Sequence, residues 1–89
     1  MLAPAMRITF KLYASLAQYL PADRRQGNIV ELDVAEGASI AQIIEPFGLP
    51  MKLVHLVLIN GVYVPPEERA TRRLVAGDVL AIWPPVAGG

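Results

Sequence analysis

The pair Asn60-Gly61 is the sequence feature that most restricts how this chain can fold. It lies between two runs rich in β-forming residues, within residues 55–64 (HLVLINGVYV). A two-residue hairpin turn requires positive φ at both central residues, a conformation that asparagine and glycine tolerate best. We therefore predict two antiparallel strands joined by a tight turn, the second of which ends at Pro65 and Pro66.

Two other stretches alternate between apolar and polar residues, as strands with one buried face do. They are residues 6–12 (MRITFKL) and residues 29–34 (IVELDV). The residues between them favour a short helix or helical turn at 13–20 and a charged surface loop at 21–28. This order predicts an antiparallel pair of strands.

The stretch EGASIAQIIEPFGLP changes the period and predicts the main helix. Ser39 stands where an N-cap belongs, and Gln42 completes a capping box. The helix is expected to end near residues 45–47, because Pro46 cannot donate to the helix and Gly48 favours a stop. The apolar residues at helical spacing are Ile40, Ile43, Ile44 and Phe47.

The last apolar run is VLAIW, residues 79–83, and it follows a Gly77-Asp78 turn. A short, continuously apolar strand is typical of the centre of a sheet. The order of elements predicts an α+β roll, in which a mixed sheet packs on one main helix. The first and last strands are expected to lie side by side and parallel at the sheet centre.

At 89 residues the chain has room for one domain. We expect residues 1–5 to form a disordered leader and residues 6–84 to form the domain. Residues 85–89 are expected to be a flexible tail that ends in Gly-Gly.

Composition argues against several classes of function. Eight basic and eight acidic side chains cancel, so we expect no general attraction to nucleic acid or to an anionic membrane. The absence of cysteine excludes disulfides, thiolate catalysis and zinc-thiolate sites. The opening MLAPAM is a poor signal peptide, and no apolar run approaches the roughly 18 residues that span a bilayer. A cytoplasmic location is expected.

Few side chains suggest catalysis. His55 is the only histidine and is interpreted as a strand-edge or partly buried residue, while Ser15 and Ser39 have no histidine near them in the sequence. The sequence has no cluster of metal ligands and no glycine-rich phosphate loop. We therefore expect no enzyme activity, no metal and no bound cofactor. The basic doublets at 24–25 and 72–73 are interpreted as solvated loop charges, with contact to an acidic partner left open.

The ending WPPVAGG is the strongest functional candidate in the sequence. Pro84 and Pro85 fix φ and favour a stiff, extended segment. Gly88 and Gly89 have no side chains and could thread a channel too narrow for other residues. This pattern suggests a carboxylate on Gly89 that is delivered into the active site of another protein. The alternative is an inert tail, since terminal residues are usually dispensable.

The stretches MRITFKLYASLAQYL, NGVYV and GDVLAIWPPVAGG resemble the ThiS/MoaD sulfur carriers, which are ubiquitin-like β-grasp proteins. The resemblance covers residues 6–89, and the ending is most similar to that of the molybdopterin synthase small subunit. It implies that an adenylating enzyme of the ubiquitin-activating type (MoeB/ThiF type) uses ATP to convert the Gly89 carboxylate into an acyl-adenylate. Sulfur from a persulfide donor would then leave Gly89 as a thiocarboxylate.

The implied sulfur acceptor is the large subunit of molybdopterin synthase (MoaE type), which would build molybdopterin for the molybdenum cofactor. Trp83 matches an aromatic position used at partner contacts, or it is simply a strand-end aromatic. An arginine common in the family's first helical segment is missing here, where residues 16–18 read Leu-Ala-Gln. Other acceptors therefore stay open, in thiamin thiazole, cysteine or tungsten-enzyme pathways. A ubiquitin-like protein modifier and an interaction module with an inert tail also stay open.

Overall fold

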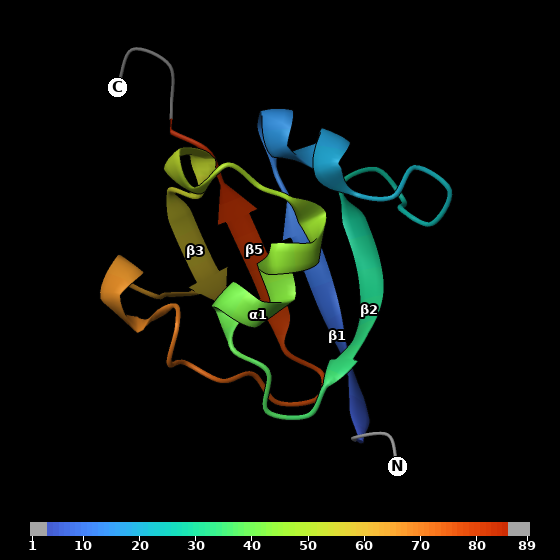
Figure 1. Ribbon diagram of the computed structural model, residues 1–89. Coiled ribbons are helices and arrows are strands. Elements are labelled where there is room, and N and C mark those ends of the chain that lie inside the picture. The colour runs from blue at the N-terminus through green and yellow to red at the C-terminus, as the bar shows by residue number, and fades with distance from the viewer. Residues whose placement is uncertain (1–3, 86–89) are drawn as a thin grey trace.

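The computed structural model describes residues 4–85. They form a five-stranded mixed sheet in the order β2-β1-β5-β3-β4, and α1 packs across one face of it (Figure 1). The strands are β1 (Ala5–Leu12), β2 (Ile29–Ala35), β3 (Leu56–Ile59), β4 (Val62–Tyr63) and β5 (Val79–Trp83). The helical segments are α1 (Ile40–Ile44) and the 3-10 helices η1 (Ala14–Tyr19), η2 (Glu45–Phe47), η3 (Met51–Leu53) and η4 (Pro66–Glu68). The predicted α+β class is confirmed.

The centre of the sheet is the pair formed by the first and last strands. β1 and β5 run parallel, with Thr9 opposite Val79 and Leu12 opposite Ile82, as predicted. β2 pairs antiparallel with the other side of β1, and β3 pairs antiparallel with β5. β1 begins at Ala5, one residue before the predicted start, because Ala5 still pairs with Ala35.

The main helix begins as predicted but loses regular geometry early. The amide of Gln42 donates to Ser39 Oγ at 3.2 Å, and the amide of Ser39 donates to Gln42 Oε1 at 2.9 Å, which confirms the capping box. The α-helical part ends at Ile44, and the chain continues to Phe47 as the 3-10 helix η2. Pro46 lies in the first turn of η2, where the missing amide costs no helical bond.

The core lies between α1 and the face of the sheet that α1 covers. Phe10 is fully buried at the centre of β1, and its ring centroid lies 5.0 Å from that of Phe47. Leu16 of η1 closes the core at the end of the sheet where β1 finishes. The buried residues of β1 are every second one, so the alternation seen in the sequence correctly assigns the side chains of this strand to the two faces of the sheet.

Candidate functional site

The candidate site is the point where the chain leaves the sheet after β5. Figure 1 shows β5 running toward the end of the sheet where η1 and η3 lie. Pro84 is half-buried and Pro85 is exposed. Gly88 and Gly89, the predicted functional pair, lie outside the described residues. The structure therefore describes the base of the tail, by which we mean the end of β5 at Ile82 and Trp83 together with Pro84 and Pro85.

Backbone hydrogen bonds hold this base on both sides. The amide of Tyr13 donates to the Ile82 carbonyl at 3.0 Å, and the amide of His55 donates to the Trp83 carbonyl at 3.1 Å. The first bond comes from the β1 side and the second from the β3 side. The last two carbonyls of β5 are thus both paired, so the tail starts from a fixed position.

An aromatic pair adds a side-chain contact at the same place. The rings of Tyr13 and Trp83 stack, with centroids 4.0 Å apart and planes inclined by 9°. Trp83 is a half-buried strand-end residue, and its contact with a partner stays a prediction. Tyr13 was missed in the sequence. The sequence gives no register for β1 against β5, and only with Leu12 opposite Ile82 do Tyr13 and Trp83 come to lie side by side.

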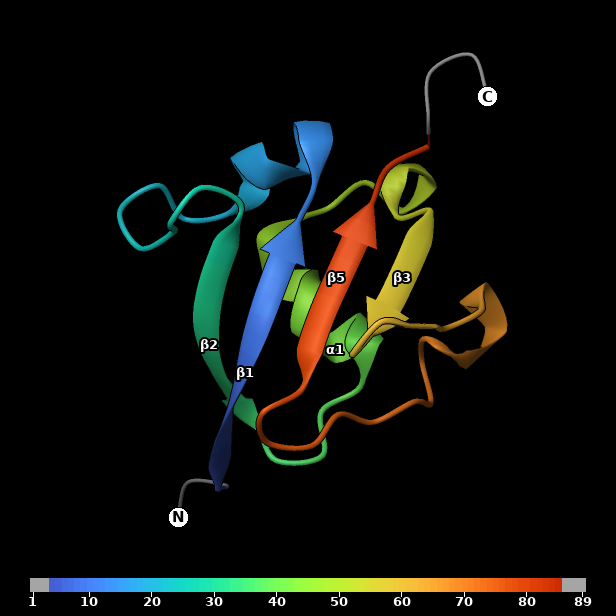
Figure 2. The ribbon, with the colours of Figure 1, turned by 180° about the vertical axis from the view of Figure 1, so that it is seen from behind.

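Figure 2 shows the molecule from the face of the sheet that α1 does not cover. This face carries an apolar strip. We call it the open-face strip. Cross-strand partners share a face, so Leu56 lies beside Trp83, and Leu58 lies beside Ala81 and Tyr63. Tyr63 is 51% exposed, while Leu56, Leu58 and Trp83 are half-buried. The strip consists of Tyr13, Leu56, Leu58, Tyr63, Ala81 and Trp83, and it reaches the point where the tail begins.

A buried arginine supports the β3 side of the base. Arg69 donates from Nη1 to the Val54 carbonyl and from Nη2 to the His55 carbonyl, both at 2.9 Å. These bonds fix the two residues that precede β3, and the amide of one of them, His55, donates to the Trp83 carbonyl. Arg69 was not singled out in the sequence, because no local pattern distinguishes it from the arginines around it. His55 is exposed and directly precedes β3, so of the two interpretations offered for it, strand edge or partly buried, the structure favours the first.

The start of β5 is held by side chains. Asp78 is buried and accepts from Asn60 Nδ2 at 2.9 Å and from the Val75 amide at 2.9 Å. Asn60 in turn accepts from the Val79 amide at 2.8 Å. The φ values of 51° at Asn60 and 82° at Gly61 confirm the predicted hairpin turn. Two turns that were predicted separately are therefore bonded to each other.

Other residues considered in the sequence have structural roles. Ser39 is the helix cap, and Ser15 is exposed on η1. Each basic doublet has one member bonded to a main-chain carbonyl, since Arg25 donates to Ala17 and Arg73 donates to Gly37. Arg25 is half-buried and not simply solvated. Within residues 4–85, no three histidine or carboxylate side chains gather as a metal site would need. Over the same residues, no helix has the length and apolar content to cross a membrane.

Three solved structures are similar to this chain. The HVO 2177 protein of Haloferax volcanii superimposes with a TM-score of 0.72 at 21% identity, over 96% of this chain and 88% of that one. SAMP1 of Haloferax volcanii gives 0.63 at 26% identity, over 93% and 99% of the two chains. A candidate molybdopterin converting factor subunit 1 from Pyrococcus furiosus gives 0.62 at 23% identity, over 91% and 99%. No curated protein sequence matches the chain significantly.

These likenesses confirm the predicted β-grasp fold of the ubiquitin-like, ThiS/MoaD type. The sequence profile of the Mut7-C ubiquitin family matches residues 5–88, which is almost the whole chain. The chain is a small ubiquitin-like protein, and it belongs to the Mut7-C ubiquitin family.

Proposed function

We propose that this chain is a sulfur carrier whose Gly89 carboxylate is adenylated by a partner enzyme and converted to a thiocarboxylate. The observation that carries the proposal is the fixed base of the tail. The last two carbonyls of β5 both accept hydrogen bonds, one from Tyr13 and one from His55, and the ring of Tyr13 stacks on that of Trp83. A rigid base loses less conformational entropy when the tail enters a partner's active site. The likeness to SAMP1 and to the molybdopterin converting factor candidate supports the same assignment.

The division of labour follows from the chemistry. A carboxylate resists nucleophiles until it gains a leaving group, and ATP supplied by an enzyme of the MoeB/ThiF type provides one by forming an acyl-adenylate with release of pyrophosphate. A donor persulfide attacks that carbonyl and displaces AMP, and a thiol then cleaves the resulting acyl disulfide to leave the thiocarboxylate. The carrier supplies only the acyl group, so we propose that it is not itself an enzyme and holds no cofactor.

The chain's own residues position this group. Trp83 is the last residue of β5, and the next two residues, Pro84 and Pro85, have a restricted φ. Gly88 and Gly89 would occupy the narrowest part of a partner's channel, because they have no side chains. The open-face strip provides apolar surface next to the base of the tail, where an activating or acceptor enzyme can dock.

We further propose molybdopterin synthesis as the pathway, with a large synthase subunit of the MoaE type as the acceptor. The likeness to the molybdopterin converting factor candidate favours this acceptor over thiazole or cysteine formation. Transfer of a thiocarboxylate sulfur to a pterin precursor would return Gly89 to a carboxylate. A protein modifier would use the same activated carboxylate but would form an isopeptide bond to a lysine.

The test is mass spectrometry of the chain after incubation with the activating enzyme, ATP and a persulfide donor. We expect the mass to rise by the difference between one sulfur and one oxygen atom. The matched control lacks Gly88 and Gly89 and should keep its mass and its unfolding curve. An unchanged mass for the intact chain, under conditions that convert an established carrier, would contradict the proposal.

A second incubation identifies the acceptor. The thiocarboxylated chain is mixed with a molybdopterin synthase large subunit and a pterin precursor, and the expected result is loss of the added sulfur mass. Retention of the sulfur would reject molybdopterin synthesis as the pathway. Covalent conjugates to lysines of other proteins would instead identify a modifier.

A further inference from the structure

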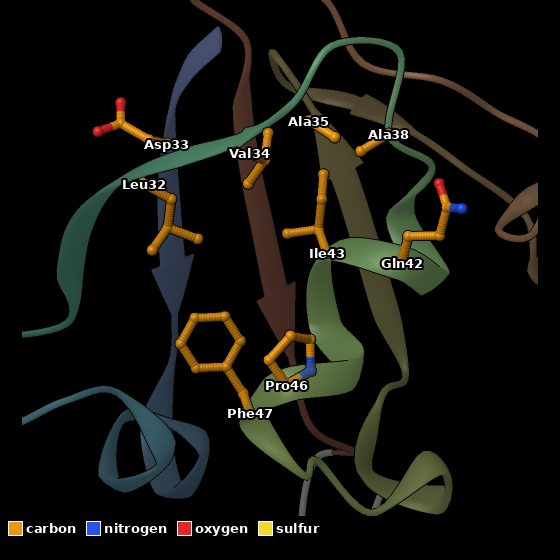
Figure 3. Close-up of a pocket in the computed structure, with 9 residues that line it drawn as sticks. All are labelled: Leu32, Asp33, Val34, Ala35, Ala38, Gln42, Ile43, Pro46 and Phe47. Carbon is orange, nitrogen blue, oxygen red and sulfur yellow. The ribbon is translucent and has the colours of Figure 1, made fainter. Parts of the chain in front are cut away.

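A second surface lies at the edge of the sheet opposite β4. It is formed between the edge strand β2 and the helical segment α1–η2. It is a groove of about 440 Å³ with mainly apolar walls. Figure 3 shows Leu32 and Val34 of β2 facing Ile43 and Phe47, while the Asp33 carboxylate points away from the cavity. The residues that line the groove are Leu32, Asp33, Val34, Ala35, Ala38, Gln42, Ile43, Pro46 and Phe47.

The strand beside this groove lies at the edge of the sheet. β2 is the first strand in the sheet order, and within residues 4–85 it pairs with no strand other than β1. On its outer side, Ile29 at the start of the strand bonds to Gln26, and Glu31 and Asp33 follow. The Leu12 amide donates to the Asn28 carbonyl, and the Glu36 amide donates to the Pro4 carbonyl. Hydrogen-bonded pairs recur at every second residue of an antiparallel ladder, so the even-numbered residues of β2 bond to β1. The amides and carbonyls of Glu31 and Asp33 therefore point out of the sheet.

The charges at this edge indicate what can pair with it. Glu31 accepts from the Thr9 hydroxyl at 2.6 Å, and Asp33 pairs with Arg7 at 3.0 Å. Of these two carboxylates, Asp33 is ion-paired with a guanidinium, whereas Glu31 is bonded to a neutral hydroxyl. If β2 of a second copy paired antiparallel with this edge through these residues, carboxylates would face carboxylates, which destabilises a sheet. A strand with lysine or arginine at those positions would instead be attracted.

We propose that β2 and its groove bind an extended segment of another protein in which aliphatic residues alternate with lysine or arginine. The segment would add a strand to the sheet through the outward amides and carbonyls of Glu31 and Asp33. Its aliphatic side chains would enter the groove above Ile43 and Phe47, and its basic side chains would lie beside the two carboxylates. This site requires neither the tail nor the open-face strip.

The first test uses a short, capped peptide of alternating lysine and valine, titrated into isotopically labelled protein and followed by amide NMR. The expected shifts concentrate at Glu31 and Asp33 and at the groove residues Ile43 and Phe47. The matched peptide has glutamate in place of lysine and should bind at least about tenfold more weakly, since close like charges oppose association. Equal affinity for both peptides would overturn the proposal.

Two variants of Glu31 separate the contribution of its backbone amide to peptide binding from the contribution of its charge. Glu31→Pro removes an outward amide that the ladder does not use and should weaken peptide binding about fivefold or more. Glu31→Gln keeps the amide, removes the charge and tests the proposal even if the proline variant does not fold. The control Glu67→Gln, on the exposed helix η4, should bind as the parent chain does. Unchanged binding by Glu31→Gln would overturn the basic character of the ligand.

Three further outcomes are decisive. Peptide shifts confined to the open-face strip would reject the groove as the site, and concentration-dependent shifts at β2 without peptide would show that a second copy is the occupant. Deletion of Gly88 and Gly89 should leave peptide binding unchanged. A failure here is therefore distinguishable from a failure of the sulfur-carrier proposal.

Discussion

The two faces of the sheet carry side chains from the same strands but meet very different surroundings. On the face that α1 covers, Phe10 and Ile82 are fully buried. On the other face, Leu56, Leu58 and Trp83 are only half-buried. Full burial of a large apolar side chain contributes about 1.5–3 kcal/mol, and partial burial contributes correspondingly less. Stability is therefore concentrated on one face, and the other can hold apolar residues for recognition.

The largest expected effect on stability comes from truncating a large side chain on the face that α1 covers. Phe10→Ala should lower the free energy of unfolding by about 3–5 kcal/mol, because it removes a fully buried ring that contacts Phe47. Denaturant unfolding curves measure the loss. The matched control is Lys11→Ala, the next residue along β1 and on the open face. Equal losses in the two variants would break the distinction between the faces.

The next effect tests whether buried polar contacts matter as much as apolar ones. Arg69→Met should cost about 2–3 kcal/mol, because the carbonyls of Val54 and His55 lose their donors. Faster hydrogen exchange of the His55 amide should accompany the loss, since that amide bonds to Trp83. Arg72→Met, at an exposed position, is the control and should change little. Slow exchange at His55 in the Arg69 variant would show that the base of the tail does not depend on Arg69.

A smaller effect on stability is expected on the open face. Trp83→Ala removes the stack with Tyr13 and should cost about 1–2 kcal/mol. Its effect on the rate of sulfur loading should be larger than that of Tyr63→Ala, which lies on the same face away from the tail. Unfolding curves and the mass-shift assay measure the two quantities. Loading of the Trp83 variant at the rate of the parent chain would place partner recognition elsewhere.

The smallest effect is expected at the exposed pair of Arg7 and Asp33. The hydrogen bond and the positive charge of Arg7 lower the pKa of Asp33. A lowered carboxyl pKa stabilises the folded state above the unfolded-state pKa, and this contribution is lost as the pH falls through the folded-state value. Acidification should therefore lower the free energy of unfolding of the parent chain by a small amount. The Asp33→Asn variant has no carboxyl at this position and should not show that loss. Parallel acid-unfolding profiles for the two proteins would contradict this assignment.

The elements that the sequence predicts well are those set by neighbouring residues. Alternation in residues 6–12 predicts β1, and Asn60-Gly61 predicts the turn because both residues tolerate positive φ. The capping box of Ser39 and Gln42 is equally local. The early end of α1 is less predictable, because a five-residue helix followed by η2 depends on how Phe47 packs against Phe10.

The site depends on contacts between distant parts of the chain. Nothing near Arg69 in the sequence indicates that its guanidinium reaches Val54 and His55. The stack of Tyr13 on Trp83 follows only once the register of β1 against β5 is known. The groove beside β2 could not be predicted at all, since its shape comes from the packing of α1–η2 against an edge strand.

The position of β5 also governs when the protein can become functional during its synthesis. Among the strands within residues 4–85, the one that separates β1 from β3 is translated last, and it must insert between two strands made earlier. Thr9 cannot pair with Val79 until the chain has been synthesised through β5, so closure of the sheet has to wait for that strand. A prematurely terminated chain would lack both the closing strand and the segment that follows it. The order of synthesis therefore makes completion of the sheet depend on the same strand from which Pro84 and Pro85 extend.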